Sequence, residues 1–225
     1  MMLSPTVPRP HAPVPAAAQA VPGHNRWHPD IPGVAEVITG GSVRLECEGA
    51  LPGDEAVLCG PIVVVGAEPG DVIVVDVLAL GRRDGRHAPG AHPGVIGCAP
   101  APHSVRRARR SPVSRPEGVI LGRVRPGLRG YEQVAAEAVP TTLRGREIVD
   151  CAVAPLTAGS RILLPVHVRG AKLSVGDLHF PSPEAPDCPG SAMPGWIDLR
   201  VNLTKRGVER FGVTGPMLMP GPDAA

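Results

Sequence analysis

Aromatic residues are scarce in this sequence: Trp, Tyr and Phe together make up 2% of its 225 residues. A core of this composition has to be packed from Val, Leu, Ile and Ala, and few rings remain that could stack on nucleic-acid bases. The net charge is only +2, so no overall field directs the chain toward nucleic acid or a membrane surface. No apolar run approaches the ~18 residues that a membrane span needs. Neither a membrane nor a nucleic-acid partner is therefore expected.

Paired metal-binding cysteines are also missing. The five cysteines are Cys47, Cys59, Cys98, Cys151 and Cys188, and none stands in a C-x-x-C spacing. Scattered thiols of this kind are typical of buried small apolar residues in a reducing compartment. The N-terminus lacks a basic segment followed by an apolar core. We therefore expect a cytoplasmic protein.

Glycine and proline are abundant, with 28 and 29 residues respectively. Such a chain disfavours long helices and favours short strands joined by turns. Residues 1–23 are rich in Pro and Ala and are expected to be a disordered lead-in. Residues 24–213 are expected to form one domain, and residues 214–225 a flexible tail.

Alternating or β-branched runs predict strands in most of that domain. Strands are expected at 34–39 and 42–48, joined as a hairpin by Gly40-Gly41, and on either side of the Glu68–Asp71 turn within residues 60–78. Further strands are expected at 117–124 and 196–204, with helices at 131–139 and 205–211. The fold class is therefore mainly β: a single β-sandwich of jelly-roll type with one or two short helices.

Residues 163–180 hold a strand that breaks at Gly170, a loop ending in Gly176-Asp177, and a second strand. Because alternate strand residues share a face, Asp177 and His179 are expected to point the same way. A carboxylate beside an imidazole is a candidate acid/base or metal-binding pair. The alternative is a turn Asp and a strand His that only hydrogen-bond a neighbour.

Three further segments carry candidate groups. His24, His28 and Asp30 surround Trp27 and could line a site, or be the solvated rim of a buried Trp. His87 and His92 lie in a Gly/Pro-rich loop, which restricts an imidazole as a catalytic or ligand role requires; a surface role is the alternative. The basic run Arg106–Arg110 has no interleaved aromatics, so a solvated loop is favoured over a nucleic-acid patch.

Several of these segments, taken in order, resemble the formamidase/acetamidase family. They are HNRWHPDIP at 24–32, GPIVVVGAEPGDVIVVDV at 60–77, HPGVIGCAP at 92–100, EGVILG at 117–122, LLPVHVRGAKLSVGDLHF at 163–180, and the region from Trp196 to Phe211. The two longest contain GAEPGD and GAKLSVGDLHF, which are too long for chance agreement.

The resemblance implies a mainly β, jelly-roll-like fold and hydrolysis of a short amide, such as formamide or acetamide, to ammonia and a carboxylate by a homo-oligomer. The polar positions that match the family are Trp27, Asp30, His92, Asp177 and His179. Our hypothesis is that Asp177 and His179 orient or activate water, and that His92 holds the carbonyl or protonates the leaving nitrogen. Whether a divalent metal ion takes part is left open; Asp177 and His179 would hold it. Trp27 and Asp30 are the expected substrate-binding residues.

The sequence departs from the family pattern at several polar positions. Ala56 stands where the family has His, Ala192 stands where it has Glu, and residues 181–187 replace a Gln-Gly-Asp-Gly-Glu run. Glu184 and Asp187 are the candidate substitutes, and Glu184 is a third expected substrate-binding residue. Two further functions stay open: a catalytically weakened relative that binds a small ligand or a protein, and a binding protein that acts through the Arg106–Arg110 run.

Overall fold

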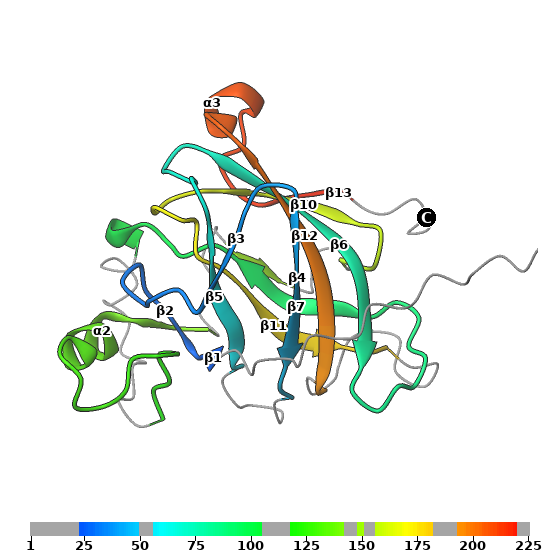
Figure 1. The fold of residues 1–225 in the computed structure, drawn as a ribbon, viewed down its shortest axis with the longest axis horizontal. Helices are drawn as coiled ribbons and strands as arrows, with labels where there is room; N and C mark the ends of the chain where they lie inside the picture. Colours follow the sequence, from blue (N-terminus) through cyan, green and yellow to red (C-terminus); the bar gives the residue numbers. More distant parts are fainter. Residues whose placement is uncertain are drawn as a thin grey trace, which may run out of the picture.

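The structure, a computed structural model, describes residues 23–49, 56–104, 118–141, 148–150, 156–181 and 193–219. Two sheets face each other, as Figure 1 shows, and enclose one apolar core. The six-stranded sheet runs β1-β5-β11-β7-β9, with β3 beside β5, and the five-stranded sheet runs β13-β10-β6-β12-β4. The predicted sandwich is confirmed. Apart from its last residue, the expected lead-in at 1–23 lies outside the described ranges.

The described residues place eleven strands in the two sheets. The six-stranded sheet contains β1 (Gly23–His24), β3 (Ala35–Val37), β5 (Leu58–Val64), β7 (His92–Gly97), β9 (Ile148–Asp150) and β11 (Leu173–His179). The five-stranded sheet contains β4 (Gly41–Cys47), β6 (Val72–Arg82), β10 (Arg161–Pro165), β12 (Gly195–Thr204) and β13 (Met217–Met219). A two-stranded ribbon pairs β2 (Arg26–Trp27) with β8 (Val139–Pro140).

The hairpin predicted at Gly40-Gly41 is wrong. The turn is tight, since the Gly41 amide donates to the Ile38 carbonyl, but β3 pairs with β5 while β4 pairs with β12. The turn therefore carries the chain from one sheet to the other. Glycines at a turn indicate a reversal, and they do not say which strands pair afterward.

Residues 65–71 and 168–177 share a pattern in which Gly-Ala is followed by Gly-Asp, and the strands around them pair with one another. Strand β5 pairs antiparallel with β11, and β6 pairs antiparallel with β10. The chain passes from the six-stranded to the five-stranded sheet between β5 and β6, and in the reverse direction between β10 and β11. The two Gly-Asp pairs differ in place, because Asp71 precedes β6 whereas Asp177 lies within β11.

Asp71, the last residue of the GAEPGD sequence, has a structural role. Its buried carboxylate accepts hydrogen bonds from the Glu68 amide at 2.9 Å, the Arg206 amide at 2.8 Å and Lys205 Nζ at 2.6 Å. Burial opposes the charge, but these donors together hold the pKa of Asp71 below its usual value. The turn therefore joins the β5–β6 connection to the segment that follows β12.

Both predicted helices are present, α2 (Tyr131–Glu137) and α3 (Gly207–Phe211). As predicted, α2 buries Tyr131 and Val134, which pack with Ile31, Leu121 and Ala138. Figure 1 shows α2 beside β2, away from the main core. No helix in the described ranges is long and apolar enough to cross a membrane.

Two further strand expectations need correction. Residues 118–124 make only isolated bridges at Leu121 and Val124, because Gly118 and Gly122 adopt positive φ values that interrupt a strand. Residue 117 lies outside the described ranges. In the segment expected to be a tail, residues 217–219 form β13, which pairs with β10 at the edge of the five-stranded sheet.

Candidate active site

His92 begins β7, directly opposite His179 on β11. The two imidazole rings lie 5.6 Å apart, centroid to centroid, at an interplanar angle of 39°. Both are buried, His92 at 1% and His179 at 8% exposure. The structure therefore brings together two histidines that are distant in the sequence.

Asp177 lies beside His179, with 3.4 Å between its Oδ2 atom and Nε2 of the imidazole. The sequence predicted a loop ending at Gly176-Asp177, but β11 runs without a break from Leu173 to His179. Asp177 is in the left-handed region at φ 57°, a conformation that Asp tolerates better than most residues. The predicted loop end is wrong, while the predicted proximity of Asp177 and His179 is confirmed.

The left-handed residue changes which side chains face the core. Val175 and Leu178 both belong to the core between the sheets, although residues three apart in a regular strand point to opposite faces. Because Asp177 reverses the alternation, His179 points away from the core that Leu178 enters. Phe180 packs against that core as well.

Gly94 makes room for this group of side chains. A Cβ atom at Gly94 would lie 2.6 Å from Oδ2 of Asp177 and 2.8 Å from Nε2 of His179. Any larger residue at position 94 would therefore occupy the space that the Asp177 carboxylate and the His179 imidazole share. Sequence reasoning did not single out Gly94; its place in the His-Pro-Gly sequence after a candidate His was the available signal.

His92 is held in one tautomer. Its Nδ1 atom lies 2.9 Å from the Gly90 carbonyl oxygen, and because a carbonyl only accepts, Nδ1 carries the proton. Burial lowers the pKa of His92 and a charge on His179 would lower it further, whereas the Gly90 carbonyl and Asp177 act in the opposite direction. At neutral pH His92 is thus neutral, with a lone pair on Nε2.

Trp27 is buried at 2% exposure in a small cluster with Ala56, Leu58, Val95 and Val139. Val95 belongs to β7, the strand that carries His92. Among the described residues, the indole N–H of Trp27 has no hydrogen-bond partner. Ala56, at the position where the resemblance implies a histidine, adds its methyl group to this cluster.

His24 forms a second buried polar pair. Its Nε2 atom lies 2.8 Å from Ser174 Oγ, and its Nδ1 atom 2.6 Å from the Arg26 carbonyl. Burial lowers the pKa of His24 to about 4, despite a small rise from that carbonyl. A histidine that stays neutral and hydrogen-bonded on both nitrogens connects β1 to β11 and positions the segment that carries Trp27.

The remaining candidates lie elsewhere. The carboxylate of Asp30 is 74% exposed, 3.9 Å from His28 Nδ1, so the structure places it at the surface. Glu184, Asp187, Ala192 and the Arg106–Arg110 run lie outside the described residues. Lys172 donates to the carbonyls of Pro29 and Ile31 and so fixes the backbone of the segment before β3.

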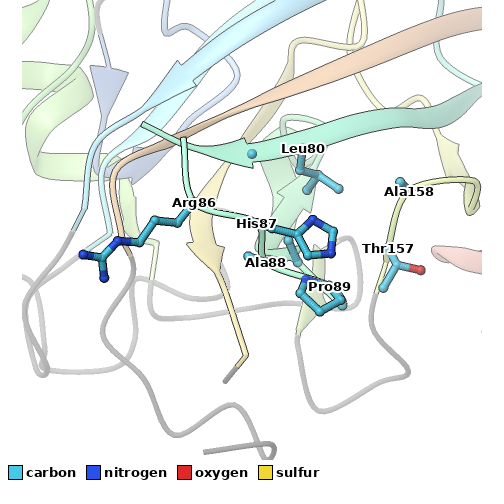
Figure 2. A pocket seen from close by; sticks show the side chains of 10 residues that line it. Leu80, Arg86, His87, Ala88, Pro89, Thr157 and Ala158 are labelled. Atoms are coloured by element: carbon cyan, nitrogen blue, oxygen red, sulfur yellow. The ribbon is translucent and has the colours of Figure 1, made fainter. Parts of the chain in front are cut away.

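A hollow of about 630 Å³ borders the loop that leads into His92. Figure 2 shows the His87 ring in it, facing Thr157 and Ala158, while Arg86 points away. Gly90 and Ala91 belong to its lining. His87 thus borders a cavity beside the loop that leads into β7.

A metal ion would need more ligands than Asp177 and His179 offer. Among the described residues, no group of three or more His, Cys, Asp and Glu side chains is arranged to hold one. Asp177 and His179 alone would supply two ligands, fewer than a stable protein site requires. The described side chains therefore do not make a metal site by themselves.

The sequence pattern that defines the Acetamidase/Formamidase family matches residues 11–56 and 84–225. An acetamidase from Mycolicibacterium smegmatis is 32% identical over 292 aligned positions, covering 90% of this chain and 71% of the relative. A formamidase from Methylophilus methylotrophus is 29% identical, covering 88% of this chain and 68% of the relative. Because both alignments are longer than the 225-residue chain, the relatives carry insertions that this chain lacks.

Among solved structures, a gamma lactamase from Delftia acidovorans superposes with a TM-score of 0.75 at 29% identity. The match covers 91% of this chain and 70% of the lactamase. The fold of this chain is therefore shared with a larger protein.

Proposed function

This chain belongs to the Acetamidase/Formamidase family, and on that basis we propose that it hydrolyses the C–N bond of short linear amides, such as formamide or acetamide, to ammonia and a carboxylate. The observation that carries the proposal is the convergence of His92, Asp177 and His179 in one buried group. Each of the three comes from a segment that resembles the family.

Amide hydrolysis needs an activated water, stabilisation of the developing oxyanion and a proton for the departing nitrogen. We assign the first task to His179, which takes a proton from water. The Asp177 carboxylate, 3.4 Å away, stabilises the imidazolium that forms. The same proton then passes to the leaving nitrogen as the C–N bond breaks.

His92 has a different task, because its lowered pKa makes a protonated ring scarce at neutral pH. Its Nε2 lone pair suits a hydrogen-bond acceptor for the amide N–H of the substrate. This role differs from our hypothesis from the sequence, in which His92 holds the carbonyl or protonates the leaving nitrogen. The buried indole N–H of Trp27 supports its predicted role in binding substrate, with the substrate carbonyl oxygen as the group it would reach.

The test is ammonia release from formamide, acetamide and propionamide. Asp177→Asn keeps a residue that tolerates the left-handed backbone while removing the charge, and His179→Gln removes the base; each should lower kcat/KM by about 100-fold or more. His103→Gln, a change at an exposed histidine on another segment, is the matched control and should leave the rate unchanged. Wild-type protein that releases no ammonia, or variants as active as it is, would overturn the proposal.

The remaining expectations are proposals with their own checks. The expected homo-oligomer is supported by the edge strand β13, where Met217 and Met219 are about half exposed, because an unpaired edge can pair with another chain. Light scattering on the purified protein would measure the subunit number. Elemental analysis would test the divalent ion, cell fractionation the cytoplasmic location, and retention on DNA or RNA at low salt the expected lack of a nucleic-acid partner.

A further inference from the structure

Two cysteine thiols meet between the sheets, away from the proposed site. Cys47 ends β4 of the five-stranded sheet, and Cys59 lies in β5 of the six-stranded sheet. Both are free and buried, at 0% and 4% exposure. Neither has a task in the amidase mechanism above.

Their sulfur atoms converge on the same part of the core. Cys47 Sγ donates to the Val175 carbonyl at 3.9 Å, and Val175 is the direct partner of Cys59 across the β5–β11 ladder. Cys59 Sγ in turn donates at 2.7 Å to the carbonyl of Glu46, the residue before Cys47. Each thiol therefore contacts the immediate backbone neighbourhood of the other.

The two thiols also affect each other's ionisation. The neighbouring Cys47 thiol lowers the pKa of Cys59 against the effects of burial and of Glu46 and Glu48, while the pKa of Cys47 rises. The thiolate is the reactive form of cysteine. Cys59 also retains 4% exposure whereas Cys47 has none, so Cys59 is the thiol that a small oxidant reaches first, and Cys47 is positioned to react second.

We propose that Cys47 and Cys59 form a redox-sensitive dithiol that a peroxide converts to a disulfide joining the two sheets. In the first step the Cys59 thiolate attacks one oxygen of hydrogen peroxide, the O–O bond breaks, and Cys59 becomes a sulfenic acid as water leaves. In the second step the Cys47 sulfur attacks Cys59 Sγ, the S–O bond breaks, and a second water leaves. The two thiols lose two electrons in total, and the peroxide gains them. A small oxidant suits a thiol that is almost fully buried.

The experiment treats the full chain with hydrogen peroxide, blocks the remaining thiols, and maps peptides without reduction by mass spectrometry. We expect a linked pair of peptides that contain Cys47 and Cys59. We also expect the melting temperature of the oxidised protein to rise by about 5 °C, because the crosslink restricts the unfolded chain. A reductant should reverse both changes.

Three variants separate the roles of the thiols. With dimedone present, Cys47→Ser should accumulate an adduct at Cys59, whereas Cys59→Ser should give neither a disulfide nor an adduct at Cys47. Cys98→Ser is the matched control: Cys98 is equally buried, its pKa is raised by burial alone, and its loss should leave the disulfide intact. Free Cys47 and Cys59 after oxidation, or Cys59 linked to Cys151 or Cys188, would overturn the proposal; the peptide map of wild-type protein decides this even if a variant does not fold.

Discussion

At the scale of single residues, the proposed site depends on the absence of a side chain at Gly94. Gly94 has no Cβ, and the space this leaves is filled by the Asp177 carboxylate and the His179 ring. The Asp177 backbone oxygen borders the same space, since it would lie 2.7 Å from a Cβ atom at Gly94. A flexible side chain can turn away from an added methyl group, but backbone cannot.

Gly94→Ala should therefore destabilise the fold by about 1–3 kcal/mol and lower amide hydrolysis more than that loss explains. The control is Gly176→Ala, on the neighbouring strand, where a Cβ would meet Leu58 and the Val57 carbonyl instead. Unfolding curves and ammonia release, measured below both melting temperatures, should show similar destabilisation and lost activity only for Gly94→Ala. Equal activity in the two variants would remove Gly94 from the site.

Protonation of one buried residue, His24, is expected to change the stability of the whole domain. Its pKa is about 4 when folded and about 6.5 when unfolded, so the unfolded chain binds the proton more tightly. The neutral His24 ring therefore stabilises the folded state fully above pH 6.5, and this stabilisation is lost as the pH falls toward 4. This difference in the pKa of His24 changes the free energy of unfolding by up to about 3 kcal/mol.

We therefore expect the unfolding free energy of wild-type protein to fall between pH 7 and pH 4.5 more steeply than that of His24→Gln. Chemical denaturation at several pH values measures both slopes. His103→Gln, at an exposed position, should retain the wild-type slope. Parallel slopes for wild type and His24→Gln would show that another group controls the transition.

At the scale of elements, each of the two lysines of the chain stabilises one loop between strands through hydrogen bonds. Lys172, in the β10–β11 connection, donates to the Pro29 and Ile31 carbonyls, and burial lowers its pKa. Lys205 donates to the Gly66 carbonyl and to Asp71. The two lysines therefore act on different turns of the same sandwich.

Lys172→Met should speed amide hydrogen exchange in the segment around Ile31 and cost about 2 kcal/mol of stability, since a charged donor to two carbonyls is lost. Lys205→Met should instead speed exchange at residues 66–71. Exchange followed by mass spectrometry resolves the two segments. Increased exchange at both segments in either variant would contradict the assignment of one turn to each lysine.

At the scale of the molecule, one core is shared by both sheets. Val64, Leu173 and Val175 enter it from the six-stranded sheet, and Val75, Leu164 and Leu199 from the five-stranded sheet. Neither sheet can lose the other without exposing its own apolar face. The sandwich should therefore unfold as one unit.

The two tryptophans allow this to be measured. Trp27 reports on the cluster beside the six-stranded sheet, and Trp196 lies in β12 of the five-stranded sheet under the Arg44 guanidinium, 4.2 Å from the ring centroid. In Trp27→Phe and Trp196→Phe, fluorescence and far-UV circular dichroism should give one midpoint for each variant. Separate midpoints for fluorescence and dichroism would show that the sheets unfold independently.

Local patterns were enough to predict most of the strands, both helices and the family, because alternation, turn residues and long matching segments are properties of neighbouring residues. They also indicated Asp177 and His179, which are two positions apart. They failed at Gly40-Gly41 and at β13, where the outcome depends on which distant strand is available to pair. They also failed at residues 118–124, where two glycines with positive φ interrupt the expected strand.

Other features follow from the folded chain alone: His92 lies opposite His179, Gly94 leaves their shared space open, and Cys47 meets Cys59 between the sheets. Each of these contacts joins strands that are distant along the chain or belong to different sheets. A linear pattern specifies which face of a strand is apolar, but the register between strands follows from the packing of the whole core.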